Sequence, residues 1–276
     1  MIRIGFLGPK GTFSHEAVKE YIKKIKEYEI VESNTIPDLM VSVSEGLLDE
    51  AVLPVENSLE GAVTSTLDMF AEDLNITIKA ELIIPINLNL LVKENSKRED
   101  IKAILSHPQP IGQCRKYTNN NFSNAEIRPV LSTAAAAEEV ATGDGTTAAI
   151  GSAIAGEIYN LKVLDSNIQD GGNNFTRFVI ISKEKSNKTG NDKTSIVFST
   201  DNKPGSLYRI LDIFNIWDIN MTKIESRPSK EQLGKYIFYV DIIGHQEDDD
   251  IKDALSMVRR KTSFLKILGS YPIDIT

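Results

Sequence analysis

The sequence predicts an α/β protein with a large N-terminal domain and a smaller β-α-β-β-α-β domain after it. Short apolar runs alternate with helical periodicity up to Ser182, which is typical of an α/β domain. A polar run from Lys183 to Asp192, without an apolar anchor, then interrupts the pattern. The elements after it come in the ferredoxin-like order. At 276 residues the chain is long enough for two cores.

Short apolar runs predict the strands of the N-terminal domain. Their length and bulk suit buried strands, and segments with helical periodicity lie between them. The predicted strands are Ile2–Leu7, Glu50–Pro54, Leu88–Val92, Lys102–Ser106, Thr147–Ile150 and Phe178–Ile181. The predicted helices are Glu16–Tyr28, Val63–Phe70, Ile111–Tyr117 and Ala134–Ala141.

The C-terminal segment predicts two helices and four strands. Its second helix begins with acidic residues and ends with Arg259, Arg260 and Lys261, an arrangement that the helix dipole favours. In order, the predicted elements are strand Thr194–Thr200, helix Gly205–Asn215, strands Asn220–Arg227 and Lys235–Ile243, helix Asp248–Thr262 and strand Phe264–Gly269. We therefore expect a first domain at 1–183, a linker at 184–193 and a second domain at 194–276.

Composition excludes several classes of function. The net charge is −8 and no basic stripe is present, so we expect no nucleic-acid partner. The single cysteine, Cys114, excludes an internal disulfide and a cysteine-rich metal site. The N-terminus lacks the apolar core of a signal peptide, and no apolar run is long enough to span a membrane, so we expect a cytoplasmic protein.

Motifs for cofactors and nucleophiles are missing from the sequence. There is no G-x-G-x-x-G dinucleotide fingerprint, no phosphate-binding loop and no G-x-S-x-G nucleophile elbow. His15, His107 and His245 lie far apart in the sequence and lack metal-ligand spacing. We therefore expect neither a cofactor nor a metal.

Four polar turns follow predicted strands and precede predicted helices. Ser, Thr or Asn in such a turn is suited to cap the helix, and for each turn alone capping is the simpler interpretation. The turns are Gly8–Ser14, Pro54–Gly61, Ser106–Gln109 and Ser132–Thr133. Because ligands bind at the carboxyl ends of strands in open α/β sheets, and helix N-termini attract anions, the set predicts a site for a small anion.

The segment Asn173–Phe178 carries the densest group of polar side chains. Gly171 and Gly172 precede it and allow a sharp turn of the backbone. Two amides, a hydroxyl and a guanidinium then lead into a predicted buried strand. Arg177 presents a planar fork that suits a carboxylate.

Five segments of the chain resemble the prephenate dehydratase family. Gly8–Ser14, Pro54–Ser58 and Asn174–Phe178 resemble its catalytic motifs, and Lys203–Leu207 and Glu225–Pro228 resemble its phenylalanine-binding regulatory ACT domain. The resemblance extends from Met1 to about Pro272. The family usually has alanine where Ser206 stands. Because no chorismate mutase domain precedes the motifs, the resemblance implies the monofunctional form.

This resemblance implies a fold and an activity. The fold is a two-lobed catalytic domain like periplasmic binding proteins, with lobes at 1–80 plus 165–182 and at 81–164, followed by an ACT domain. The activity is conversion of prephenate to phenylpyruvate, water and carbon dioxide in phenylalanine biosynthesis, under allosteric control by L-phenylalanine. The family assembles as a homodimer or homotetramer. Two alternatives stay open: an arogenate dehydratase, and a non-catalytic sensor of amino acids.

The resemblance also assigns residues. Thr176 is expected to donate a hydrogen bond to the departing hydroxyl and Arg177 to bind a substrate carboxylate, with Asn57 and Ser58 assisting. Glu56 and His107 are both candidates for the proton source. The other expected substrate-binding residues are Thr12, Ser14, Ser106, Gln109, Ser132, Thr133, Asn173, Asn174 and Phe175. The expected phenylalanine-binding residues are Pro204, Gly205, Ser206, Leu207, Asn220, Met221, Glu225, Ser226 and Arg227.

Overall fold

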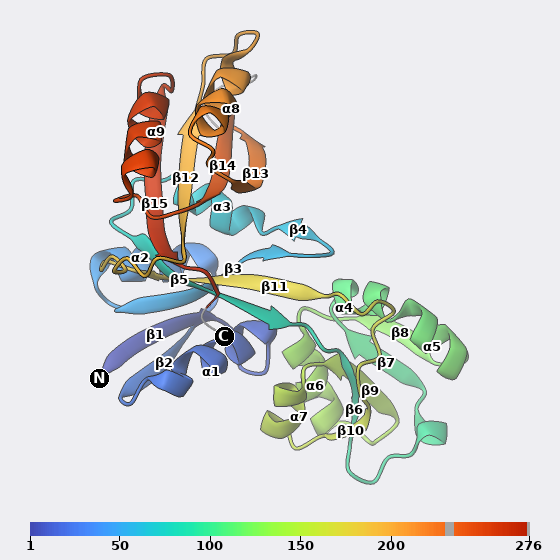
Figure 1. The fold of residues 1–276 in the computed structure, drawn as a ribbon. Helices are drawn as coiled ribbons and strands as arrows, with labels where there is room; N and C mark the ends of the chain where they lie inside the picture. Colours follow the sequence, from blue (N-terminus) through green and yellow to red (C-terminus); the bar gives the residue numbers. More distant parts are fainter. Residues whose placement is uncertain (230–234, 275–276) are drawn as a thin grey trace.

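The computed structural model describes residues 1–229 and 235–274, which form three β-sheets (Figure 1). Two sheets form the lobes of the N-terminal domain, and the third forms the C-terminal domain, which stands on the first lobe. The predicted fold class, α/β with two lobes followed by a β-α-β-β-α-β domain, is confirmed. In the described ranges no helix has the length and apolar character needed to cross a membrane.

The sheet of the first lobe has the order β2-β1-β3-β11-β5, with the short β4 paired to β3. β1 is parallel to β2 and β3, whereas β11 returns from much later in the chain and is antiparallel to β3 and β5. The strands are β1 (Ile2–Leu7), β2 (Tyr28–Ser33), β3 (Glu50–Asn57), β4 (Gly61–Ala62), β5 (Thr77–Pro85) and β11 (Phe175–Ser182). The helices are α1 (Phe13–Tyr21), η1 (Ile22–Lys24), α2 (Ile36–Glu45) and α3 (Thr64–Phe70).

The sheet of the second lobe has the order β10-β6-β9-β7-β8. The chain crosses between the lobes twice, after β5 and before β11. The strands are β6 (Asn89–Val92), β7 (Ala103–Ser106), β8 (Glu126–Pro129), β9 (Thr147–Gly151) and β10 (Lys162–Asp165). The helices are η2 (Arg98–Asp100), α4 (Pro108–Gln113), α5 (Arg115–Asn121), α6 (Thr133–Thr142) and α7 (Ala153–Ile158).

The C-terminal sheet is antiparallel throughout, with the order β13-β14-β12-β15. α8 and α9 pack on one face of it, around Phe198, Phe214 and Val240. The elements are β12 (Asp192–Ser199), α8 (Ser206–Ile216), β13 (Met221–Pro228), β14 (Tyr236–Ile243), α9 (Asp249–Arg259) and β15 (Phe264–Pro272). Gly205 begins α8 with a φ of +79°, a conformation that glycine adopts without steric cost.

Several predicted boundaries differ from the structure. The helix predicted at 16–28 ends at Tyr21, is followed by the short 3-10 helix η1, and gives way to the edge strand β2 at Tyr28. β5 was not predicted, and it stays in the first sheet to Pro85, so the lobe boundary does not fall at residue 80. Lys79 and Glu81 interrupt its apolar run. These charged side chains fit in a buried strand because other parts of the fold supply their ion-pair partners. β8 and β10 were also missed. The last two residues of the predicted C-terminal domain lie outside the described ranges.

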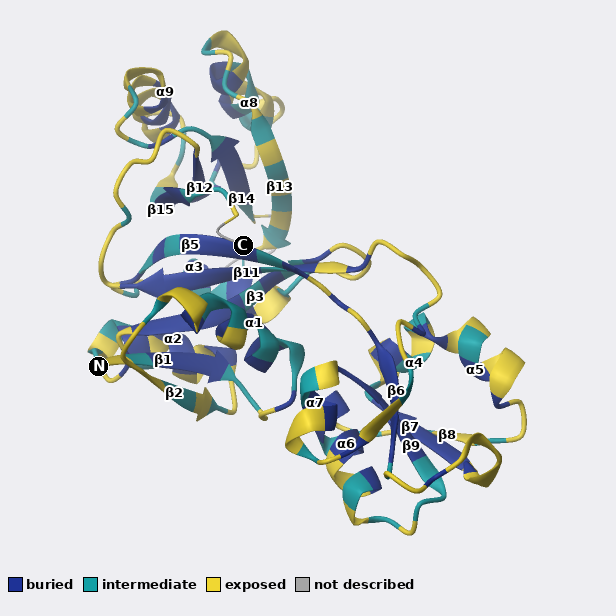
Figure 2. Cartoon of the chain, turned by 60° about the horizontal axis from the view of Figure 1, so that its bottom comes forward, coloured by how far each residue is buried: buried dark blue, intermediate teal, exposed yellow. Residues whose placement is uncertain are grey.

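The free face of the C-terminal sheet packs directly on the first lobe. Tyr239, Leu268 and Tyr271 belong to the same apolar cluster as Val179 and Ile181 of β11. Figure 2 shows β5 and β11 as buried strands between this sheet and the rest of the first lobe. β15 approaches β5 so closely that a Cβ on Gly269 would lie 2.3 Å from the carbonyl oxygen of Ile78. The core is therefore continuous across the domain junction.

Candidate active site

A cavity of about 380 Å³ lies between the two lobes, where the four polar turns meet β11. Among the described residues, its lining contains no Asp, Glu, Lys or Arg. It combines neutral polar side chains with apolar ones. The lining residues are Leu7, Gly8, Thr12, Phe13, Ser14, Pro54, Asn57, Val63, Ile86, His107, Gln109, Pro110, Gln113, Leu131, Ser132, Thr133, Asn174, Thr176 and Phe178.

Asn57 and Thr176 form the polar centre of the cavity wall. Asn57 Oδ1 accepts hydrogen bonds from the backbone N–H groups of Leu59 and Glu60, at 3.0 and 3.1 Å. These bonds fix the amide orientation, so Nδ2 donates to Asn174 Oδ1 at 2.8 Å and to Thr176 Oγ1 at 2.9 Å. No described residue accepts a hydrogen bond from Thr176 Oγ1. Its hydrogen therefore remains available to a ligand.

A β-bulge aligns these two residues. Along β11, Phe178 lies opposite Pro54 and Arg177 lies opposite Glu56, so β3 has one extra residue at this point. Bulges of this kind redirect side chains and are common beside active sites. As a result Asn57 lies opposite Thr176, and both line the cavity.

Arg177 and Glu56 lie on the other face of the sheet, which corrects their predicted roles. Successive side chains of a strand point to opposite faces, so Arg177 points away from the face that carries Thr176 and Phe178. Arg177 Nη1 instead lies 2.6 Å from Asp241 Oδ2 of the C-terminal domain. Glu56 Oε2 accepts a hydrogen bond from Lys223 Nζ at 2.8 Å. Neither residue lines the cavity.

The charge of Arg177 is secured by its surroundings. Burial lowers the pKa of its guanidinium, but the nearby Asp241, Tyr271 and Glu81 raise that pKa by more, so the net pKa lies above its ordinary value. The side chain of Arg177 is only 12% exposed. It is a permanent buried cation at the domain junction.

Two helix N-termini face the cavity in place of a cation. Thr12 caps α1 by accepting the N–H of His15 at 3.4 Å, and Ser132 caps α6 by accepting the N–H of Ala135 at 3.0 Å. Ser14 and Thr133, in the first turns of these helices, also line the cavity. The partial positive charge of a helix N-terminus favours an anion in such a position.

The second lobe contributes three further polar side chains. His107 caps α4, and its Nδ1 accepts the N–H of Gln109 at 3.4 Å. Gln113 was missed by the sequence analysis, although it lies four residues after Gln109 and hence on the same side of the helix. Its Oε1 accepts a hydrogen bond from Asn174 Nδ2 at 2.9 Å. Gln113 therefore links the second lobe to the segment that leads into β11.

The lobes also touch at the rim of the cavity. Gly11 has a φ of +91° and lies against Ala155 and Tyr159 of the second lobe, so a side chain there would be strained. Ser152 Oγ donates a hydrogen bond to the carbonyl oxygen of Gly11 at 2.8 Å. This contact closes one side of the cleft.

Four more predicted site residues do not line the cavity. Ser106 is fully buried, and its Oγ donates to the carbonyl oxygen of Ile150 at 2.7 Å. Ser58 Oγ donates to the carbonyl oxygen of Asn173 and accepts the N–H of Phe175, so it fixes the entry into β11. Phe175 is 42% exposed. These contacts give Ser58, Ser106, Asn173 and Phe175 supporting positions around the cavity, and their substrate contacts stay a prediction.

Comparisons with known proteins identify the family of this chain. Residues 4–186 match the family model described as prephenate dehydratase, and residues 194–256 match that of the ACT domain. The chain belongs to the prephenate dehydratase family. It is 42% identical to a prephenate dehydratase of Methanocaldococcus jannaschii over 270 residues, covering 96% of each chain.

Two further relatives support the assignment. A bifunctional chorismate mutase/prephenate dehydratase of Aquifex aeolicus is 43% identical over 271 residues, which is 98% of this chain and 74% of that protein. The crystal structure of a prephenate dehydratase from Arthrobacter aurescens in complex with L-Phe superposes with a TM-score of 0.91 at 34% identity. It covers 98% of this chain and 90% of that chain.

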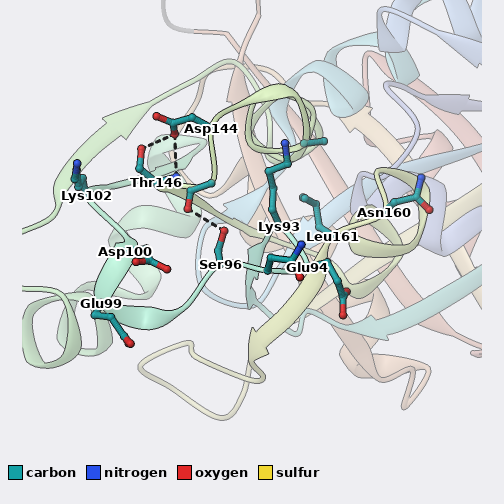
Figure 3. A pocket seen from close by; sticks show the side chains of 13 residues that line it. Lys93, Glu94, Ser96, Glu99, Asp100, Lys102, Asp144, Thr146, Asn160 and Leu161 are labelled. Carbon is teal, nitrogen blue, oxygen red and sulfur yellow. Dashed lines mark hydrogen bonds between the residues drawn. The ribbon is translucent and has the colours of Figure 1, made fainter.

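A second cavity, of about 670 Å³, lies on the second lobe and does not fit a substrate of this family (Figure 3). Four carboxylates and two lysines line it, so a dianion would meet net repulsion. Ser96 and Asp144 are already hydrogen-bonded within its wall: Figure 3 shows Ser96 bonded to the loop at Gly145 and Asp144 bonded to Thr146. The lining carboxylates are those of Glu94, Glu99, Asp100 and Asp144.

The predicted effector residues lie at the start of α8 and along β13, an edge strand of the C-terminal sheet. Ile224 of this strand is 46% exposed, while Glu225 is partly buried. Arg227 also has a partner outside the C-terminal domain: its Nη2 lies 3.0 Å from Asp68 Oδ1 of α3. Arg227 therefore contacts the catalytic domain across the junction.

Proposed function

We propose that this chain catalyses the decarboxylating dehydration of prephenate to phenylpyruvate, water and carbon dioxide. The observation that carries the proposal is the Thr176–Asn57 pair in the wall of a cleft between two lobes, in a chain of the prephenate dehydratase family. The ring carboxylate leaves as carbon dioxide, and its bonding electrons complete the aromatic ring as the hydroxyl departs with a proton. Aromatisation makes the reaction strongly favourable.

Thr176 stabilises the departing oxygen. Because Asn57 donates to Thr176 Oγ1, the hydroxyl is polarised and becomes a better donor toward the substrate. A donor fixed before the reaction costs no reorganisation when charge develops on the leaving oxygen. Thr176 therefore acts by hydrogen bonding, and a separate acid supplies the proton.

His107 is the better placed of the two proton donors that the sequence left open. It lines the cavity, whereas Glu56 points to Lys223 of the C-terminal domain. Because Nδ1 of His107 accepts the N–H of Gln109, a proton on Nε2 is the one that the ring can donate. We assign the acid role to His107.

The neutral lining favours prephenate over arogenate. The amine of arogenate would require a carboxylate partner, and no Asp or Glu is found among the described lining residues. The carboxylates of prephenate fit the N-termini of α1 and α6 and the amides of Asn174 and Gln113. A lining carboxylate would also repel the ring carboxylate.

The C-terminal domain is proposed to bind L-phenylalanine at the start of α8 and along β13, between two copies of the chain. Support comes from the ACT family match and from the relative that was crystallised with L-Phe. We propose a homodimer or homotetramer that acts in the cytoplasm. The proposed domains are residues 1–183 and 194–276, joined by a linker at 184–193.

The test is phenylpyruvate formation from prephenate at neutral pH, with and without L-phenylalanine, and with arogenate as the parallel substrate. Turnover of prephenate that responds to L-phenylalanine is expected. Turnover of arogenate alone would contradict the substrate assignment. Loss of activity in His107→Gln, with prephenate binding intact, would support the acid role, and full activity would remove it.

A further inference from the structure

We propose that Arg177 and Glu56 are positioning residues that connect the C-terminal domain to Thr176 and Asn57. The inference rests on the proposed function, because it concerns the geometry of that reaction's site. Each of the two is the chain neighbour of a cavity residue, and each makes an ion pair with the other domain.

The two residue pairs lie back to back on the same two strands. Thr176 lies opposite Asn57 and faces the cavity, while Arg177 lies opposite Glu56 and faces the C-terminal sheet. Since neighbouring residues of a strand share the peptide unit between them, a shift of the Arg177 backbone moves Thr176 as well. The contacts of Arg177 and Glu56 with the C-terminal sheet therefore fix the positions of the two strands that carry the hydrogen bond between Asn57 and Thr176.

The ion pairs between Arg177 and its neighbours are buried, and their positive and negative charges balance. Asp241 Oδ2 lies 2.6 Å from Arg177 Nη1, and its Oδ1 accepts the Oγ hydrogen of Ser195 at 2.5 Å. Glu81 lies 3.5 Å from the same Nη1 and receives two hydrogen bonds from Lys193 Nζ, at 2.7 and 2.8 Å. Asp241 and Glu81 are 4% and 0% exposed. Movement of β14 against β11 would separate Asp241 from Arg177 and leave the Asp241 carboxylate without its cation.

Glu56 is shared between two cations. Its Oε2 lies 2.8 Å from Lys223 Nζ and 4.0 Å from Arg177 Nε. Arg177 Nε is buried and has no hydrogen-bond partner within the described residues. Glu56 can therefore turn from Lys223 to Arg177 when β13 withdraws. Such a turn would pull on β3 beside Asn57.

The strand that holds Lys223 also holds predicted effector residues. Met221 and Glu225 lie two positions on either side of Lys223 in β13. β13 is an edge strand, bonded to β14 alone in its sheet among the described strands. An effector that shifts this strand would move Lys223 away from Glu56. The ion pair thus gives a physical route from the effector to the Asn57–Thr176 pair.

The test compares two lysines of the C-terminal sheet. Lys223→Met removes the ion pair with Glu56. Lys266→Met is the matched control, because Lys266 Nζ also crosses the junction, donating to the carbonyl oxygen of Glu72 at 2.6 Å, but Glu72 is not the chain neighbour of a residue that lines the cavity. Lys223→Met is expected to lower kcat by about 2- to 30-fold, with KM nearly unchanged and a weaker response of kcat to L-phenylalanine. Lys266→Met is expected to keep wild-type kinetics.

Glu56→Gln sharpens the test through a double-mutant cycle. If the two residues act through one contact, the double variant with Lys223→Met should be no slower than the slower single variant. Arg177→Lys should retain most of kcat, since it keeps the charge opposite Asp241. Unchanged kcat and unchanged L-phenylalanine response in Lys223→Met, with a melting temperature like that of Lys266→Met, would overturn the inference alone. A wild-type chain without prephenate turnover would overturn the proposed function, and the inference with it.

Discussion

The two faces of the β3–β11 pair differ in the kind of polar group that they use. The cavity face presents hydroxyls, amides and helix N-termini, and none of the described residues lining it is Asp, Glu, Lys or Arg. The junction face, one residue away along each strand, carries buried ionic groups that include Arg177 and Asp241. Prephenate is a dianion that loses one carboxylate as carbon dioxide. It therefore needs hydrogen-bond donors, but not a cationic side chain that would hold that carboxylate tightly. The charged side chains of the junction face serve instead to hold the two domains in one arrangement.

Breaking the charge balance of the junction face should have the largest effect. Arg177→Met removes the cation paired with Asp241, while Glu81 keeps its ion pair with Lys193. Removing one partner of a buried ion pair typically costs ~3–5 kcal/mol. We expect a fall in melting temperature and in the denaturant midpoint of the catalytic domain. A matched surface variant, Arg98→Met, removes an ion pair of a 42% exposed arginine and should change stability by less than about 1 kcal/mol.

If Arg177→Met and Arg98→Met were equally stable, the junction charges would not hold the domains. A thermal melt of both variants beside the wild type, at one protein concentration, decides this. Concentration is kept constant because assembly of copies also shifts the melting temperature.

Thr176→Ala tests the cavity face. Loss of one preorganised donor to a developing oxyanion typically costs ~10²–10³ in rate. We expect kcat for prephenate to fall by about this factor, while KM and the melting temperature change little. Thr176→Ser, which keeps the hydroxyl, should recover most of the activity. Turnover near that of the wild type in Thr176→Ala would remove this hydroxyl from the mechanism.

Asn57→Ala should have an intermediate effect, and it should lower both kcat and stability. It removes the donor to Thr176 Oγ1 and leaves the N–H groups of Leu59 and Glu60 without their acceptor. Unsatisfied groups of this kind cost ~1–3 kcal/mol. We expect a fall in kcat of about 10-fold or more, together with reduced stability. Asn57→Asp keeps the acceptor for Leu59 and Glu60 but places a buried carboxylate opposite Asn174 Oδ1, so it should restore neither kcat nor full stability.

The difference between the two faces explains what the sequence could predict. The four polar turns led to Thr12, His107 and Ser132 because capping residues at strand ends are a local pattern. The period of a strand predicts that Thr176 and Arg177 point to opposite faces, but it does not say which face is the cavity. The bulge in β3 and the partners in the C-terminal domain depend on contacts between distant parts of the chain. For that reason Arg177 was assigned to the substrate.

The same reasoning applies to β5. Its charged residues Lys79 and Glu81 interrupt the apolar run that would predict a buried strand. Glu81 is buried because Lys193, more than a hundred residues later, donates to both of its oxygens. No local pattern contains that information. Gln113 differs, since its spacing from Gln109 on one helix would have been enough to include it.

The smallest expected effect concerns His15, which supports the loop beside the cavity face. It is buried against Phe6, and its Nδ1 accepts the N–H of Gly11 at 3.2 Å. Burial lowers the pKa of His15 below its ordinary value of 6.5, and the nearby Lys19 and Lys10 lower that pKa further, against the opposite effect of Glu32. The folded chain therefore holds this histidine neutral.

Because the unfolded chain binds this proton more readily, stability should fall as the pH drops below about 6.5. The loss ends once the pH is below the lowered pKa of the folded state. Glu16 acts in the opposite direction: burial raises its pKa above 4.5, so protonation there favours the folded chain. Denaturant midpoints at pH 7.5 and 5.5 isolate the histidine when wild type is compared with His15→Gln. The wild type should lose more stability over this interval. Equal changes of the midpoint in the two proteins would show that His15 has the same proton affinity in the folded and unfolded chains.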